Sequence, residues 1–196
     1  MLSLMPAQPL HEHAADSLAF IRNTMARSAT FTAVPGQGGI AMGVIGLVAA
    51  AVASQTRDPQ AWLTVWLLAA VGAIGIGLAA MQVKARRHQV AVWSASGRRF
   101  AQGFVPSLAG GAVITAALVR AGTLDLLPAV WLLLYGAGIL AGATASVPIL
   151  TWLGVALMGL GAAASLVGRF GDLWLAVGFG GLHIVFGIII ARKHGG

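Results

Sequence analysis

The residue with the most scope for chemistry is His183, which lies near the middle of the last apolar segment, in GFGGLHIVFG. An ionisable side chain within a membrane span is rare and often marks an ion path, a ligand site or a proton relay. The alternative is a neutral imidazole that is hydrogen-bonded to a neighbouring helix, through Tyr135, Ser165 or Thr115, or to a carbonyl. The sequence therefore offers His183 with Tyr135 as a candidate intramembrane site for a ligand or solute, and it leaves the structural alternative open.

A second candidate is the stretch FTAVPGQGG, which begins at Phe31 and separates a charged segment from an apolar one. Pro35 cannot continue a helix in its interior, whereas Gly36, Gly38 and Gly39 accept the backbone angles of a turn. These four residues are expected to form a hinge, or elbow. A glycine-rich helix N-terminus also binds anions. However, GQGGIAMG matches neither the P-loop nor the dinucleotide-binding pattern, which favours the plain hinge.

Other reactive groups are missing from the apolar segments. The chain has no cysteine, which excludes thiolate metal ligands and a cysteine nucleophile. No Asp, Glu, Lys or Arg lies inside an apolar segment, and the chain has no GxSxG motif. His11 and His13 flank Glu12, but residues two apart on a helix face different directions. We therefore expect no catalytic residue, no metal site and no cofactor, and we predict that the chain is not an enzyme.

Apolar segments make up most of the chain, and they would position His183 and Tyr135. Of its 196 residues, 58% are hydrophobic and 9% are charged, whereas soluble domains are about a quarter charged. About 20 apolar residues span a bilayer as a helix. Six segments qualify, and none alternates as a barrel strand does: Gly38–Ser54, Ala61–Val83, Phe100–Val119, Leu126–Ser146, Pro148–Val167 and Leu173–Ala191. We predict an all-α polytopic membrane protein whose six transmembrane helices form three helical hairpins.

An amphipathic helix is expected before the first span, in HEHAADSLAFIRNTMARSATF. Its apolar residues share one face at helical spacing, and its polar residues share the other: Ala14, Leu18, Ile21, Met25 and Ala29 against Glu12, Asp16, Asn23 and Arg27. A helix of this kind lies along the membrane interface. The chain is thus expected to have two parts. Residues 1–37 form the interfacial helix and the Pro-Gly elbow, and residues 38–196 form the transmembrane domain.

If the six segments cross the membrane in turn, the basic residues between them are divided unevenly between its two sides. One side carries nine: Arg22, Arg27, Lys84, Arg86, Arg87, Arg98, Arg99, Arg192 and Lys193. The other side carries only Arg57, Arg120 and Arg169. Because basic loops stay cytoplasmic, both termini are predicted to be cytoplasmic, in a bacterial inner membrane. Topology and anionic headgroups account for the net charge of +7, so we expect no nucleic-acid partner.

The three loops on the less basic side are alike. Each has one arginine and one acid, and each precedes a glycine-rich helix led by a tryptophan: Trp66, Trp131 and Trp174. Two interpretations stay open. The hairpins are copies of one ancestral hairpin, or tryptophans and glycines simply recur because membrane helices favour them.

Several exposed residue types indicate contacts outside the bundle. The loop KARRHQVAVWSASGRR, Lys84–Arg99, has two basic ends around Trp93, and Phe20 lies on the polar face of the N-terminal helix. The candidate contacts for a partner or for lipid are Phe20, Arg22, Arg27, Arg86, Arg87, Trp93, Arg98 and Arg99. Glycines four apart, such as Gly39 and Gly43, allow close helix packing within the chain, in a homo-oligomer or against another membrane subunit.

The chain resembles an uncharacterised family of bacterial six-span membrane proteins. The resemblance is carried by FIRxTM at Phe20–Met25, FTAVPG at Phe31–Gly36 and GGLHIxFGxxIAR at Gly180–Arg192. It covers most of the chain, and it implies the six-span topology and a bacterial inner membrane. No activity is known for the family, so the resemblance implies no catalytic or binding residue.

Together these features favour a non-enzymatic accessory, sensor or regulatory subunit. It would contact a membrane or cytosolic protein partner through the N-terminal helix and the basic loop 84–99. The alternative is a facilitator for a small neutral solute or a lipid, with its site near His183. A membrane enzyme acting on lipid or quinone is a third interpretation, and it needs a polar cluster assembled from separate spans.

Overall fold

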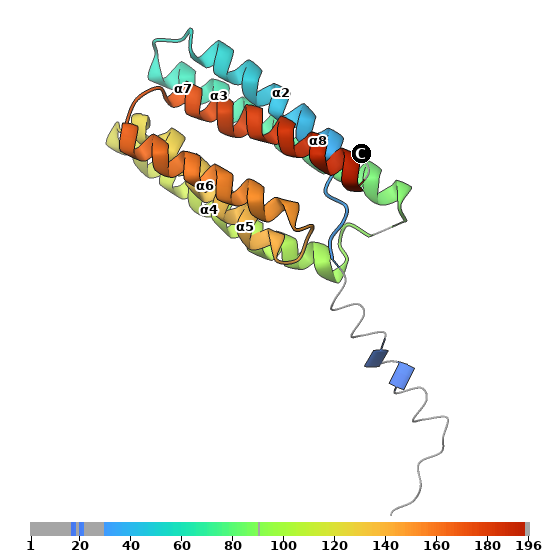
Figure 1. Ribbon diagram of the computed structural model, residues 1–196. Helices are drawn as coiled ribbons and strands as arrows, with labels where there is room; N and C mark the ends of the chain where they lie inside the picture. The colour runs from blue at the N-terminus through green and yellow to red at the C-terminus, as the bar shows by residue number, and fades with distance from the viewer. Residues whose placement is uncertain (1–16, 19, 22–29, 90, 195–196) are drawn as a thin grey trace, which may run out of the picture.

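The computed structural model describes residues 17–18, 20–21, 30–89 and 91–194. Six helical segments in this part are long and apolar enough to cross a membrane, so the chain is a multi-pass membrane protein, and the expected all-α fold is confirmed (Figure 1). The helices are α2 (Gly36–Ala53), α3 (Pro59–Arg87), α4 (Ala95–Ala121), η1 (Leu124–Leu126), α5 (Leu127–Ala143), α6 (Ile149–Val167), α7 (Gly171–Leu175), η2 (Ala176–Leu182) and α8 (His183–His194).

The expected N-terminal amphipathic helix lies mostly outside the described residues. Residues 17, 18, 20 and 21 are described, and all four are helical. Arg22, Arg27, His11 and His13 fall outside the described part. The amphipathic helix therefore stays a prediction.

Short polar signals set the ends of the long helices. The Asp58 carboxylate accepts a hydrogen bond from the Ala61 N–H at 2.8 Å and caps α3, whose first turn contains Pro59. Ser94 caps α4 in the same way by accepting from the Gly97 N–H. Helices α4 and α6 end at Gly122 and Gly168, which have φ values of 71° and 63°. Only glycine adopts this left-handed backbone without strain.

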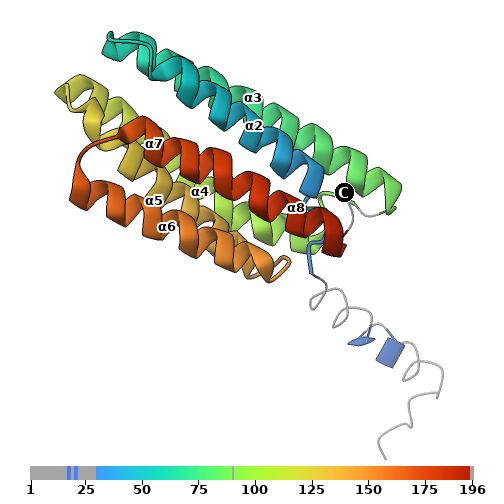
Figure 2. The ribbon, with the colours of Figure 1, turned by 45° about the horizontal axis from the view of Figure 1, so that its top comes forward.

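The helices form two layers, which are seen apart in Figure 1, whereas in the turned view of Figure 2 α7 and α8 are drawn over the second layer. The first layer contains α2, α3 and the continuous run of α7, η2 and α8. The second layer contains α4, α5 and α6, and α5 packs against both of its neighbours. Of the three connected helix pairs, the first two pack as hairpins. The members of the third pair lie in different layers and still touch each other, but α6 packs mainly on α5 and α8 packs mainly on α2.

Glycines bring the backbones together inside each layer. A Cβ added to Gly43 of α2 would lie 2.7 Å from the carbonyl oxygen of Gly180 in η2. In the second layer, a Cβ on Gly136 of α5 would lie 2.8 Å from the carbonyl oxygen of Gly154 in α6. Such approaches leave no space for a side chain. Much of the glycine pattern therefore serves packing within the chain.

The predicted role of the elbow glycines in a turn was wrong. Gly36, Gly38 and Gly39 belong to the first turns of α2, and none of them has a positive φ. They face neighbouring helices instead, since a Cβ on Gly38 would lie 2.7 Å from the Ala80 Cβ of α3. Pro35 is the N-cap residue of α2, with an extended backbone, so the change of direction occurs before the glycines.

We predict that Gly43→Ala destabilises the transmembrane domain by about 1–3 kcal/mol, the usual cost of overpacking. The added methyl group would meet the backbone of η2, which cannot move aside as a flexible side chain can. The measurement is unfolding of the purified protein in detergent, followed by circular dichroism.

The matched control is Gly75→Ala in α3. Among the described residues, nothing lies within 4 Å of a Cβ added at Gly75. Alanine favours a helix over glycine by up to about 1 kcal/mol, so this variant should be neutral or slightly stabilised. Equal losses in both variants would contradict the assignment of Gly43 to close packing.

Candidate functional site

His183 and Tyr135 form a hydrogen-bonded pair between the two layers. His183 is 5% exposed, its Nε2 lies 3.0 Å from the Tyr135 hydroxyl, and its Nδ1 lies 3.0 Å from the carbonyl oxygen of Gly178. A carbonyl only accepts hydrogen bonds, so Nδ1 carries the proton and donates it to Gly178. In the neutral ring, Nε2 then accepts from Tyr135. Both ring nitrogens are thus engaged, as the structural alternative for His183 predicts.

A π-helical segment leads directly into His183. The segment η2 runs from Ala176 to Leu182, and its sequence AVGFGGL contains three glycines. A π-helix has a wider turn than an α-helix and is frequent at functional sites. Here Gly178, within the wide turn, is the residue whose carbonyl accepts from His183. The local backbone and the side-chain contact therefore belong to one feature.

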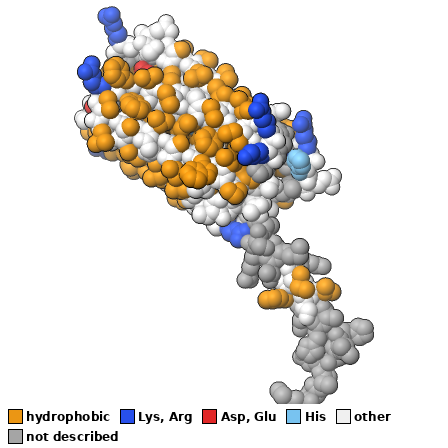
Figure 3. All heavy atoms as spheres, in the orientation of Figure 1, with side chains coloured by type: hydrophobic (Ala, Val, Ile, Leu, Met, Phe, Trp, Pro, Cys, Tyr) orange, Lys and Arg blue, Asp and Glu red, His pale blue; other side chains and the backbone are white. Residues whose placement is uncertain are grey.

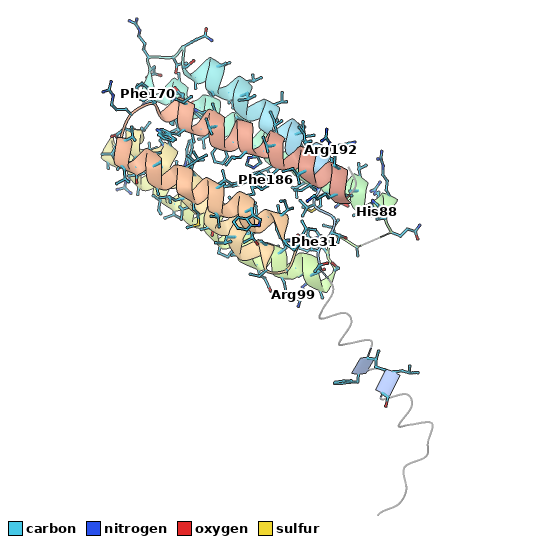
Figure 4. The ribbon with its side chains drawn as sticks, viewed as in Figure 1. Phe31, His88, Arg99, Phe170, Phe186 and Arg192 are labelled. Atoms are coloured by element: carbon cyan, nitrogen blue, oxygen red, sulfur yellow. The ribbon has the colours of Figure 1, made fainter. Side chains whose placement is uncertain are left out.

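Aromatic rings continue from this pair in both directions along the contact between the layers. The run, which we call the aromatic seam, has adjacent ring centroids 5.3–6.4 Å apart, in the order Phe31, Phe100, Phe104, Tyr135, Phe179, Trp66, Trp62 and Trp131. Both layers contribute rings, and Figure 4 shows Phe31 and Phe186 between them. Aromatic side chains therefore supply much of the contact between the layers.

A carboxylate and three indoles close the seam at the end formed by the loops before α3, α5 and α7. Asp172 Oδ1 accepts from Trp62 Nε1 at 2.7 Å and from Trp66 Nε1 at 3.3 Å. Trp62 stacks on Trp131 with an interplanar angle of 8°, and Trp131 donates to the hydroxyl of Thr115 at 2.8 Å. This cluster connects α3, α4, α5 and the start of α7.

The elbow closes the seam at the other end. Phe31 is 2% exposed, its N–H donates to the Ala145 carbonyl at 2.8 Å, and its own carbonyl accepts from the Ser146 hydroxyl at 2.7 Å. Ala145 and Ser146 lie in the turn between α5 and α6. Three residues later, the Val34 carbonyl accepts from Lys84 Nζ of α3 at 2.9 Å. The elbow is therefore attached to both layers.

The end of the bundle that carries the elbow is strongly basic, and we call it the basic end. Its charged side chains among the described residues are Lys84, Arg86, Arg87, Arg98, Arg99, Arg192 and Lys193, while all described acids lie at the opposite end. Figure 4 places His88, Arg99 and Arg192 here and Phe170 at the opposite end. Hydrophobic side chains cover the flank between the two ends (Figure 3).

The described candidate contact residues between Arg86 and Arg99 are spread over this basic end. Trp93, in the connection between α3 and α4, is 74% exposed, and Arg86, Arg87, Arg98 and Arg99 are also exposed. Phe20 is 71% exposed, and Arg22 and Arg27 lie outside the described residues. Among the described candidates, Arg86, Arg87, Arg98 and Arg99 with Trp93 form a charged surface with one prominent aromatic side chain, and not one compact site.

Three features escaped the sequence analysis. Lys84 was assigned to the exposed basic loop, but it is 4% exposed because its ammonium group binds the elbow. Nothing in the sequence indicated that the Ser146 hydroxyl binds the Phe31 carbonyl. The hydrogen bonds from two tryptophans to Asp172 were not predicted either, although the acid in each loop before a tryptophan-led helix was an available signal. Among the described residues, no group of three or more His, Asp or Glu side chains could hold a metal.

We predict that Tyr135→Phe lowers the free energy of unfolding by about 0.5–2 kcal/mol. The variant keeps the ring that contacts Phe104 and Phe179 but leaves His183 Nε2 without its donor. Thermal unfolding in detergent measures the loss. The control is Ser165→Ala, because the Ser165 hydroxyl bonds only within its own helix, to the Ala162 carbonyl. If both variants unfold alike, the Tyr135–His183 bond does not stabilise the seam.

The proposals on function rest on the geometry of this site, because comparisons with known proteins found no match. No protein-family model matches the chain, and no curated protein or solved structure is detectably similar to it. The resemblance through the FIRxTM, FTAVPG and GGLHIxFG motifs stays a prediction.

Proposed function

We propose that the chain is a non-enzymatic accessory, sensor or regulatory subunit of a bacterial inner membrane, with its basic end in the cytoplasm. The observation that carries the proposal is the segregation of charge. Among the described residues, the basic end has seven Lys and Arg side chains and no acid, and it also presents Trp93. Basic loops favour the cytoplasmic side, and an exposed aromatic residue beside arginines is typical of protein contact sites.

The attachment of the elbow supports this proposal. Phe31 is buried and hydrogen-bonded to the turn between α5 and α6, so this point of the chain is fixed at the basic end. A partner that binds this segment would also lie near the loop 84–99. The two contact regions proposed from the sequence are thus compatible with one partner.

Both ring nitrogens of His183 are hydrogen-bonded within the protein, which supports a non-enzymatic role. Its two ring nitrogens bind Tyr135 and Gly178, and no buried side-chain nitrogen or oxygen among the described residues lacks a hydrogen-bond partner. A general acid or base needs a ring nitrogen that reaches a substrate. The two hydrogen bonds of His183 support a structural role in joining the two layers.

The test is site-specific photo-crosslinking in living cells, with the photoreactive residue at Trp93. We expect one protein adduct that co-purifies with the chain at a fixed ratio. The matched control is Leu166, which is 88% exposed at the opposite end of α6 and should give no such adduct. A chain that purifies alone, with no adduct at Trp93, would overturn the proposal.

A truncation that removes residues 1–29 extends this experiment. It must end before Phe31, because Phe31 belongs to the core. We expect the adduct at Trp93 to weaken while the unfolding temperature of the bundle stays the same. An unchanged adduct would mean that the N-terminal segment does not contribute to the contact.

A facilitator for a small neutral solute or a lipid is the second candidate function. The observation that favours it is the position of the only tyrosine and the buried His183 together, between two layers that meet through side chains. Polar groups at such a boundary would line a path if the layers separated. In this case His183 and Tyr135 would contact the solute.

Vesicle permeability distinguishes the second candidate from the first. A facilitator predicts that vesicles with the full-length protein take up glycerol or urea faster than protein-free vesicles, and that His183→Ala changes the rate. Light scattering after mixing reports the uptake. If His183→Ala lowers the unfolding temperature and both proteins match protein-free vesicles, the facilitator is rejected for these solutes and His183 is structural.

A further inference from the structure

A small cavity lies beside the elbow at the basic end. Its volume is about 130 Å³, and it is lined by Pro35, Gln37, Ala80, Val83, Lys84 and Arg87. These residues come from the end of the elbow, the first turn of α2 and the last turns of α3. The inference from this cavity does not depend on either proposed function, although Arg87 is also one of the candidate contact residues.

The cavity has two chemically different walls. Gln37, Lys84 and Arg87 supply an amide and two cations, and Pro35, Ala80 and Val83 supply apolar groups. Val83 is 50% exposed and continues the apolar outer surface of α3, where Leu78 is 57% exposed. A ligand that fits this lining has an anionic group joined to an apolar part.

The positive charge of the polar wall is fixed in place. Lys84 is 4% exposed, and its ammonium group is held 2.9 Å from the Val34 carbonyl. Arg87 is exposed and offers a planar set of N–H donors, which suits phosphate oxygens. The described acids, Asp58, Asp125 and Asp172, all lie at the opposite end of the bundle. No described carboxylate therefore competes for this wall.

The start of α2 adds donors to the same wall. No side chain caps α2, and the first N–H groups of a helix have no acceptor within the helix. Gln37, which lines the cavity, lies in this first turn. The backbone thus adds to the preference for an anion that the two cations establish.

We propose that this cavity binds the phosphate group of an anionic membrane lipid. Free phosphate shares the same anionic chemistry, but it would leave the apolar wall without a ligand group. In the lipid, the phosphate lies against Arg87, Gln37 and the charge of Lys84. The glycerol and the first methylene groups follow Val83 towards the outer surface of α3.

The test is native mass spectrometry of the full-length protein, incubated in detergent with phosphatidylglycerol or with phosphatidylcholine. We expect one phosphatidylglycerol molecule to be retained and phosphatidylcholine to be released. Arg87→Gln should reduce the retention about fivefold, as expected for one basic residue near an anionic headgroup. Arg86→Gln is the matched control, because Arg86 is an exposed neighbour outside the cavity lining, and it should leave retention unchanged.

A second variant tests the cavity without changing its charge. Val83→Trp fills the apolar wall and should reduce retention at least as much as Arg87→Gln. Because Val83 is half exposed, the fold should tolerate the larger side chain, and thermal unfolding checks this. Lys84 is left unchanged, since it also holds the elbow.

Three outcomes would overturn the proposal. Equal losses in Arg86→Gln and Arg87→Gln would show that the lipid is attracted only by general surface charge. Unchanged retention in a folded Val83→Trp variant would show that the lipid binds elsewhere. If inorganic phosphate raises the unfolding temperature as much as phosphatidylglycerol, and Arg87→Gln removes both effects, the ligand is free phosphate and not a lipid.

Discussion

A polar side chain inside the bilayer must find its hydrogen-bond partner within the protein, because hydrocarbon offers none. This constraint applies above all to His183, which is buried near the middle of the last span. Its two partners, Tyr135 and Gly178, come from different layers, so satisfying one ring also fixes how the layers face each other. The rings of the aromatic seam then pack around this fixed point.

The two kinds of helix contact in this fold have different physical consequences. Inside a layer, glycines place backbone against backbone, as at Gly43 and Gly180, and any shift of one helix creates clashes along its length. Between the layers, the aromatic rings of the seam lie against one another. The layers are joined at one end by the stacking of Trp62 on Trp131, in the middle by His183 and Tyr135, and at the other end by the elbow.

Composition and hydropathy were sufficient to predict the six spans, because a bilayer restricts both the length and the polarity of a helix. The hydrogen bond between His183 and Tyr135 was also within reach, since few polar groups lie at that depth. Helix neighbours were not. Glycine spacing at Gly39 and Gly43 indicates a close contact but not its partner, and the chain order suggested that α8 would pair with α6. In the structure α8 packs on α2, because glycines on both helices fit each other.

The elbow shows why local sequence rules failed where tertiary contacts decide. Proline and glycine together predict a turn, yet α2 begins at Gly36 because its glycines are needed against α3 and α8. The sequence predicts that Lys84 is a solvated loop residue, yet it is buried and its ammonium group donates to a backbone carbonyl of the elbow. Gly36 and Lys84 both lie where the elbow contacts the first layer. The same short segment also binds the second layer through Phe31, so the elbow joins the two layers at the basic end as well as leading into α2.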